Sequence, residues 1–116
     1  MSPTTLTGAM AIDDAEVGGC FVPAGQQRIV AFAAANRDPQ VFARPDEFDI
    51  TRTPNPHLAF SAGPHYCLGA PLARMHAEIA LSALFTRLPG LRLAGLPGWL
   101  GSVPVRQIAT LPIDWD

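Results

Sequence analysis

The chain has 116 residues, a formal net charge of −2 and 48% hydrophobic residues. This length suits one domain, the hydrophobic content argues against intrinsic disorder, and the near-neutral charge gives no reason to expect nucleic acid or a charged membrane surface as a partner. Twelve prolines and ten glycines predict that turns and loops occupy much of the fold.

Short extended segments are predicted in the first third of the chain. Residues 1–10 are small and polar without a clear period, which is typical of a frayed end. The Gly-Gly pair at 18–19 can supply the positive φ angles of a two-residue hairpin turn. The apolar run 28–32 predicts a buried strand, and a turn of helix is expected from Ala33 until Pro39 stops it.

The stretch 41–56 predicts irregular backbone, because its prolines fix φ and remove hydrogen-bond donors. Two aromatic residues within it, Phe42 and Phe48, are expected to anchor this stretch to a core.

A long helix is predicted over residues 71–88, because it begins with a proline suited to a first helical turn and ends before a Pro-Gly pair. Its apolar residues predict one broad apolar face. Arg74 and Glu78 lie four residues apart on another face and can form an ion pair. Short strands are predicted over 91–93 and within 103–116.

Chemistry is concentrated in the loop of residues 60–69, which directly precedes this helix. Cys67 lies between two glycines, Gly63 and Gly69, and close to the helix N-terminus. The positive end of a helix dipole stabilises a thiolate, and a thiolate is a good ligand for a soft metal centre. The glycines have no Cβ, so the backbone can approach something large and flat.

Other roles for the two cysteines stay open at this point. Cys67 can be a buried structural thiol or a nucleophile activated by His65, although no Asp or Asn is placed to orient that histidine. It can also form a disulfide with Cys20. The absence of a recognisable signal peptide favours reduced thiols and a cytoplasmic protein, and no apolar run reaches the ~20 residues of a membrane span. A zinc site is a further alternative with unusual spacing, using Cys20, His57, His65, Cys67 and His76.

The loop resembles the haem-binding loop of cytochromes P450. The family pattern has Phe, two residues, Gly, three residues, Cys, one residue and Gly, and it is matched by Phe60, Gly63, Cys67 and Gly69. The following segment, 70–74, resembles the soluble bacterial branch of the family. The Asn-Arg-Asp-Pro phrase that ends at Pro39 is also typical of it.

This resemblance implies an α+β fold, namely the C-terminal haem-binding fragment of the P450 fold, in one partial domain over residues 1–116 whose N-terminal part is absent. The implied activity is monooxygenation with haem b (iron protoporphyrin IX), which inserts one oxygen atom from O₂ into a small apolar substrate. The implied electron donor is ferredoxin-like or flavodoxin-like, and neither nucleic acid nor a membrane is expected as a partner. The alternative is an inactive haem-binding or purely structural fragment.

The resemblance also assigns roles to individual residues. Cys67 would be the axial thiolate donor and the iron ligand, Phe60 would shield it, and His65 would donate a hydrogen bond to a haem propionate. The cofactor-binding set it implies is Phe60, Gly63, His65, Cys67, Leu68, Gly69 and Ala73. Arg74 is either a solvated helix charge or part of a surface that meets an acidic electron donor.

Two positions depart from what the resemblance implies. Relatives carry an arginine that binds a haem propionate at the position of Ala9. Arg37 corresponds to the arginine of a three-residue ion network whose other members would precede residue 1, so we expect it to lack its partners. An unpaired arginine must be exposed, because burying it would be costly.

Overall fold

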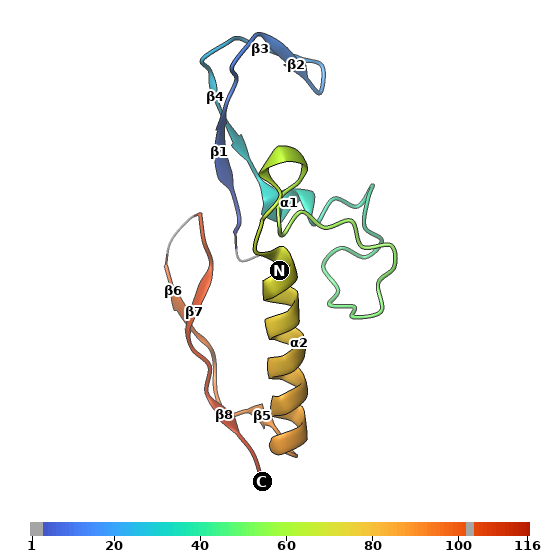
Figure 1. Cartoon of the computed structure of the whole chain (residues 1–116), viewed down its shortest axis with the longest axis vertical. Coiled ribbons are helices and arrows are strands. Elements are labelled where there is room, and N and C mark those ends of the chain that lie inside the picture. The colour runs from blue at the N-terminus through green and yellow to red at the C-terminus, as the bar shows by residue number, and fades with distance from the viewer. Residues whose placement is uncertain (1–3, 102–103) are drawn as a thin grey trace. The chain divides into compact units, whose positions relative to one another are not determined.

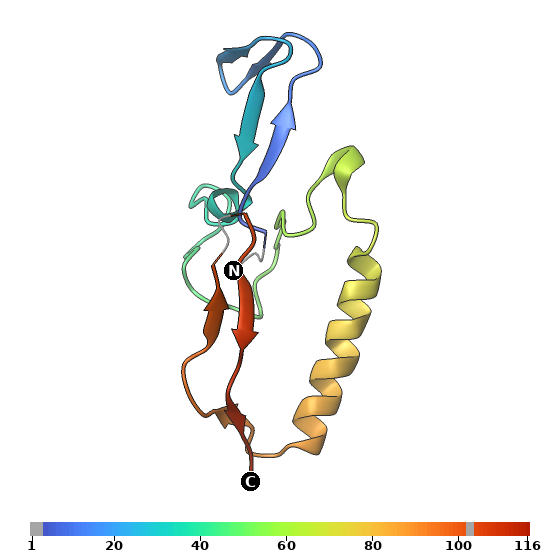
Figure 2. The same ribbon diagram turned by 90° about the vertical axis from the view of Figure 1, so that its left-hand side faces the viewer.

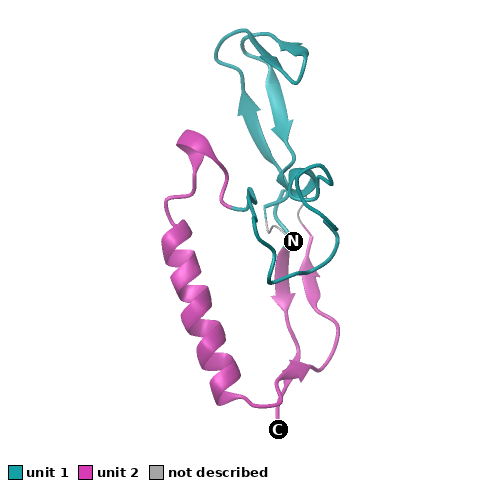
Figure 3. Ribbon diagram, turned by 90° about the vertical axis from the view of Figure 1, so that its right-hand side faces the viewer, with its two compact units in different colours: residues 1–59, 102–106 teal, residues 60–101, 107–116 magenta. Residues whose placement is uncertain are grey.

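A computed structural model describes residues 4–101 and 104–116 of the protein. These residues form two compact units, coloured separately in Figure 3. Within the described residues, unit 1 comprises residues 4–59 and 104–106, and unit 2 comprises residues 60–101 and 107–116. The candidate cysteine loop begins unit 2.

Unit 1 is built from two antiparallel strand pairs, one nested inside the other along the chain (Figure 1). Strands β2 and β3 form the inner hairpin, and β1 and β4 pair outside it. The turn between β2 and β3 has φ angles of +58° at Gly18 and +79° at Gly19, which confirms the predicted two-residue turn. The elements of this unit are β1 (Thr7–Met10), β2 (Ala15–Val17), β3 (Cys20–Val22), β4 (Gln27–Val30) and α1 (Phe32–Ala35).

Two predictions for this region were wrong. The described part of segment 1–10 is not a frayed end, because it contains β1, which pairs with β4; residues 1–3 lie outside the described residues. The predicted strand at 28–32 exists as β4, but it is not buried, since Ile29 is 73% exposed. A two-stranded ribbon covered on neither face exposes both sets of alternating side chains.

The stretch from Asn36 to Ala59 contains no helix or strand, as its prolines predicted. Phe42 is 5% exposed and anchors the stretch, whereas Phe48 is 91% exposed, so the second predicted anchor was wrong. One aromatic side chain therefore supplies most of the local core of this irregular segment.

Unit 2 contains the long helix, flanked along the chain by short elements (Figure 1). The helix α2 begins and ends within one residue of the prediction, and the chain leaves it through Gly90, whose φ is +73°. The later strands form two antiparallel pairs, β5 with β8 and β6 with β7. The elements are η1 (Gly63–His65), α2 (Ala70–Arg87), β5 (Arg92–Leu93), β6 (Gly98–Leu100), β7 (Gln107–Thr110) and β8 (Ile113–Asp114).

The surface of α2 differs from the single apolar face that was predicted. Leu72 and Ile79 lie on one side, but Leu81 lies nine residues after Leu72 and therefore about 180° round the helix. All three side chains are exposed, and so is Phe85. A helix that is apolar on opposite sides is typical of the interior of a larger protein.

Few apolar side chains in the described residues are buried: Val22, Phe42 and Ala70. None of the helices in the described segments, α2 included, has the length and apolar character that crossing a lipid bilayer requires.

Candidate functional site

The loop before α2 is closed by backbone hydrogen bonds and runs directly into the helix (Figure 2). The N–H of Cys67 donates to the carbonyl oxygen of Phe60 at 2.8 Å, and the N–H of Tyr66 donates to that of Gly63 at 3.0 Å. The N–H of Ala70 donates to the carbonyl oxygen of Cys67 at 3.1 Å. Cys67 is thereby fixed on both sides, to the start of the loop and to the first residue of α2.

Two residues at the start of the loop have left-handed backbone. Gly63 has φ of +61°, which glycine adopts without steric cost. The glycine of the loop pattern therefore lies at a position whose backbone conformation favours glycine. Ser61 has φ of +64°, a conformation that costs a residue with a Cβ about 1–2 kcal/mol. Nothing in the sequence signals this strain, because serine has no preference for positive φ.

Cys67 is exposed, which excludes the buried structural thiol as its role in this chain. A Cβ added at Gly69 would lie 3.8 Å from the cysteine sulfur, and one added at Gly63 would meet no atom within 4 Å. The next side chain, Leu68, is 98% exposed. A soft donor beside open, partly apolar space is chemically suited to a flat metal cofactor, so these residues fit a haem.

The predicted cofactor-binding residues lie together in unit 2, within the loop and the first turn of α2. His65 ends η1 and is exposed. Gly69 is the N-cap of α2, with φ of −81°, and the N–H of Ala73 donates to its carbonyl oxygen at 2.9 Å. The roles of these residues toward a cofactor stay predictions.

The ring of Phe60 has two partners that the sequence did not reveal. Tyr66 meets it edge-on, with ring centroids 6.5 Å apart and an interplanar angle of 61°. The guanidinium carbon of Arg74 lies 5.3 Å from the ring centroid, within the range of a cation–π contact. The predicted ion pair between Arg74 and Glu78 was wrong, because no such pair forms among the described ion pairs.

The structure also bears on the other roles considered for the cysteines. Both cysteines are free thiols, so the disulfide was not confirmed. The zinc alternative was wrong for the described residues, where no three His, Cys, Asp or Glu side chains come together. Within that same part of the chain, no hydrogen bond joins His65 to Cys67, which leaves the nucleophile alternative without a base in place.

Arg37 has an acidic partner within unit 1, contrary to the expectation that it would lack partners. Its Nε donates to Oδ1 of Asp46 at 2.9 Å, and the two side chains are 39% and 85% exposed. This pair borders a hollow of about 450 Å³ that is also lined by Phe42 and Asn36. Solvent weakens an ion pair this exposed, so its contribution to stability is small.

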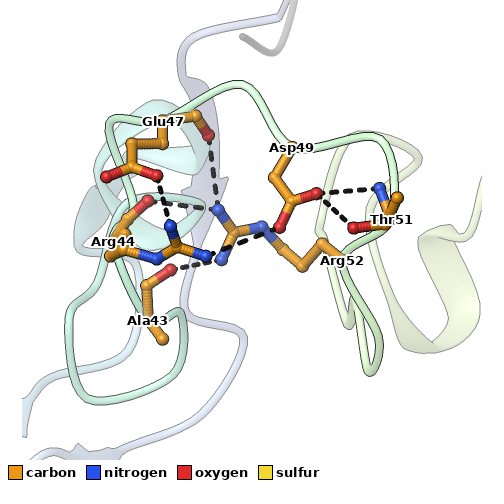
Figure 4. A network of polar contacts seen from close by, with 6 residues as sticks. All are labelled: Ala43, Arg44, Glu47, Asp49, Thr51 and Arg52. Atoms are coloured by element: carbon orange, nitrogen blue, oxygen red, sulfur yellow. Dashed lines mark hydrogen bonds and ion pairs between the residues drawn. The ribbon is translucent and has the colours of Figure 1, made fainter.

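Arg52 holds the irregular stretch of unit 1 together (Figure 4). Its guanidinium donates to the carbonyl oxygen of Ala43, to that of Arg44 at 3.1 Å and to that of Glu47 at 3.3 Å. One side chain thus satisfies three backbone acceptors in a segment without regular secondary structure, where such acceptors have no ladder or helix to bond.

Asp49 is the acidic centre of the same network (Figure 4). Its Oδ1 accepts a hydrogen bond from the Thr51 hydroxyl at 2.6 Å and another from the Thr51 N–H at 2.9 Å. These two bonds, followed by the positive charges of Arg52 and Arg44, hold the pKa of Asp49 below its usual value, and partial burial opposes them. The network is structural, since it ties residues 43–52 to one another.

Comparison with known proteins gives a consistent result. The family model described as Cytochrome P450 matches residues 1–88. The biotin biosynthesis cytochrome P450 of Bacillus subtilis is 50% identical over 93 residues, which are 80% of this chain and 24% of that protein. The 6-deoxyerythronolide B hydroxylase of Saccharopolyspora erythraea is 41% identical over 100% of this chain and 30% of its own length.

A solved structure agrees in fold. The crystal structure of P450BioI in complex with hexadec-9Z-enoic acid ligated acyl carrier protein superposes with a TM-score of 0.94 and 43% sequence identity. It matches over 99% of this chain and 30% of the solved chain. The chain therefore spans about a quarter to a third of the length of the proteins it matches.

Proposed function

Since this chain belongs to the cytochrome P450 family, we propose that it carries the cysteine-bearing part of a haem-thiolate monooxygenase. Its fold, small antiparallel strand pairs with one long helix, is the α+β fold of the corresponding part of that family. The proposed partial domain extends over residues 1–116.

One observation carries the proposal: an exposed cysteine is held by its own backbone in a closed loop. The N–H of Cys67 is bonded to Phe60 and its carbonyl oxygen to Ala70, so the sulfur is presented by a fixed backbone, with no hydrogen-bond partner of its own in the described residues. Rigid backbone support is what a metal ligand needs. Thiolate-ligated haem in this family supplies the oxygen chemistry, since the thiolate donates electron density that favours O–O cleavage.

The residues of this chain bind and orient the cofactor in the proposed scheme. Cys67 would ligate the haem iron through its thiolate, and Phe60 would exclude water from one side of that sulfur. Gly63 leaves space for the porphyrin, as its open surroundings support, and Gly69 keeps the space beside the Cys67 sulfur free of a side chain. His65 donates a hydrogen bond to a haem propionate, and its exposed position at the end of η1 leaves it free to do so. The cofactor proposed is haem b, with Leu68 and Ala73 in apolar contact.

The proposed reaction inserts one oxygen atom of O₂ into a small apolar substrate. The other oxygen atom leaves as water, which requires two protons and two electrons. A ferredoxin-like or flavodoxin-like protein supplies these electrons. The names of relatives support the reaction class, since one is a hydroxylase. A cytoplasmic location is proposed with it.

The second candidate is a haem-binding or structural fragment without catalysis. It is favoured by the exposed apolar side chains of α2 and by the small number of buried ones. Haem binds tightly when both its faces are removed from water, at about 25 cal/mol per Å² of apolar surface. The loop and the helix cover only one face of the haem. This candidate therefore predicts weak haem binding and no turnover of substrate.

The experiment is haem titration of the 116-residue chain, followed by the absorption spectrum of the reduced carbon monoxide complex at saturating haemin. Thiolate ligation is expected in the wild type and in Cys20→Ala, and it should be lost in Cys67→Ala. Equal spectra for the two variants would contradict the assignment of Cys67. Substrate oxidation by the same complex with an added electron donor distinguishes the enzyme from the non-catalytic fragment.

The same titration tests His65. Its replacement by alanine is expected to weaken haem affinity without changing the thiolate spectrum. A hydrogen bond to a charged group contributes about 1.5–3 kcal/mol. Unchanged affinity would show that His65 is only a surface residue, and a lost thiolate spectrum would show that it supports the loop instead. His76→Ala, in the exposed part of α2, is the matched control.

A further inference from the structure

Arg74 makes its contact across the loop instead of along its own helix. It lies in the first half of α2, and its guanidinium carbon is 5.3 Å from the centroid of the Phe60 ring. In the described part of the chain, no carboxylate forms an ion pair with it. The aromatic ring is therefore its principal contact, and this holds the start of the loop against α2.

Phe60 transmits this contact to the cysteine. Its ring meets Arg74, and its carbonyl oxygen accepts the hydrogen bond from the Cys67 N–H at 2.8 Å. Tyr66 packs edge-on against the same ring, with centroids 6.5 Å apart. A contact that holds the ring therefore also restrains the residue whose carbonyl oxygen fixes the cysteine backbone.

Burial of side chains contributes little to holding the loop in place. Its side chains are exposed or half-buried, and Ser61 has left-handed backbone that favours opening. When the other contributions to the free energy of loop closure are small, a contact of modest strength decides whether the loop is closed or open. A cation–π contact at an exposed site contributes about 0.5–1 kcal/mol, which corresponds to a factor of about 2–5 in an equilibrium between closed and open loop.

We propose that Arg74 is a positioning residue for Cys67 that acts through the ring of Phe60. The stacked guanidinium keeps the loop closed and thereby fixes where the thiol is presented. The relevance of this coupling to haem ligation rests on the proposed function, whereas the coupling itself is a property of the chain without cofactor.

The test measures the loop directly, in the full chain without haem. Hydrogen exchange of the Cys67 amide reports the opening of its bond to Phe60. The alkylation rate of Cys67 by iodoacetamide, in a Cys20→Ser background, reports access to the thiol. Arg74→Gln is expected to accelerate Cys67 amide exchange about 2- to 5-fold and to change the alkylation rate. Arg74→Lys, which keeps a cation, is expected to restore part of the protection.

A double-mutant cycle isolates the contact. In a Phe60→Leu background the ring is gone, so Arg74→Gln is expected to have no further effect on Cys67 amide exchange. Arg87→Gln removes a charge from the other end of α2 and is the control for net charge. The Ala73 amide, within α2, is the internal reference for folding.

Three results would overturn the proposal. The first is an unprotected Cys67 amide in the wild type, and the second is an effect of Arg74→Gln that persists undiminished in Phe60→Leu. The third is equal acceleration by Arg87→Gln. None of these results depends on haem, so a failure of the coupling and a failure of the proposed function are distinguishable.

Discussion

The strained backbone at Ser61 predicts that a single substitution stabilises the cysteine loop. Its φ of +64° costs an L-residue about 1–2 kcal/mol. Ser61→Gly removes this cost but gives the unfolded chain more freedom, which offsets about 0.4–1 kcal/mol. The net gain is about 0.5–1 kcal/mol, or roughly a 2- to 5-fold shift of the opening equilibrium. We expect the Cys67 amide to exchange more slowly by that factor.

The same substitution elsewhere provides the matched control. Ser82 lies in α2, where the backbone is helical, so Ser82→Gly is expected to weaken the helix by a few tenths of a kcal/mol. Ser61→Val should accelerate Cys67 exchange, because a β-branched residue at positive φ is strongly disfavoured. Faster exchange in Ser61→Gly than in the wild type would refute the strain argument.

Three further substitutions test unit 1. Thr51→Val removes the hydroxyl donor at 2.6 Å and should raise the pKa of Asp49 toward its ordinary value of 3.8, as measured by carboxyl NMR titration. Gly18→Ala, at φ of +58°, should destabilise the β2–β3 hairpin by about 1 kcal/mol, seen as weakened cross-strand NOEs. Phe42→Ala should cost about 3 kcal/mol or more in urea unfolding of this unit, because the ring is buried.

Each of these has a control within the same unit. Thr51→Ser keeps a hydroxyl and should leave the lowered pKa in place. Gly8→Ala, within β1 and with no atom within 4 Å of the added Cβ, should not destabilise its strand. Phe48→Ala should be nearly neutral, since that side chain is 91% exposed. If a control variant behaves like its test variant, the corresponding argument is contradicted.

The sign of the pH effect follows from the direction of the Asp49 shift. A carboxyl whose pKa is lowered in the folded state stabilises that state above its ordinary pKa of 3.8. This stabilisation is lost as the pH falls from 3.8 through the lowered value. Thr51→Val should therefore reduce the stability of unit 1 above pH 3.8 and leave it unchanged below the lowered folded-state pKa, where Asp49 is protonated in both states.

Sequence reasoning succeeded where the cause of a structure is local. The Gly-Gly turn at 18–19 was predictable because only its own φ angles matter, and α2 was predictable because prolines and a glycine bound it. It failed where the cause lies elsewhere in the chain. The strand β1 is defined by pairing with β4, and the exposure of Phe48 depends on what surrounds it.

The candidate site follows the same division. The proximity of its residues was predictable, because Cys67, its two flanking glycines and the helix start are contiguous in sequence. The stacking of Arg74 on Phe60 was not, because a cation fourteen positions after an aromatic residue has no helical or strand period that brings the two together.

The geometry of the loop and the exposure of the apolar side chains of α2 therefore have different origins. All the described contacts that fix Cys67 come from residues 60–74, so the chain itself encodes the presentation of the thiol. The apolar side chains on opposite sides of α2 gain no such partners and remain exposed. Since hydrophobic stabilisation grows with the area removed from water, substitutions at these exposed helix positions should change the stability of this chain little. Substitutions in the loop should change the hydrogen-exchange rate of the Cys67 amide, even though the surrounding side chains are exposed.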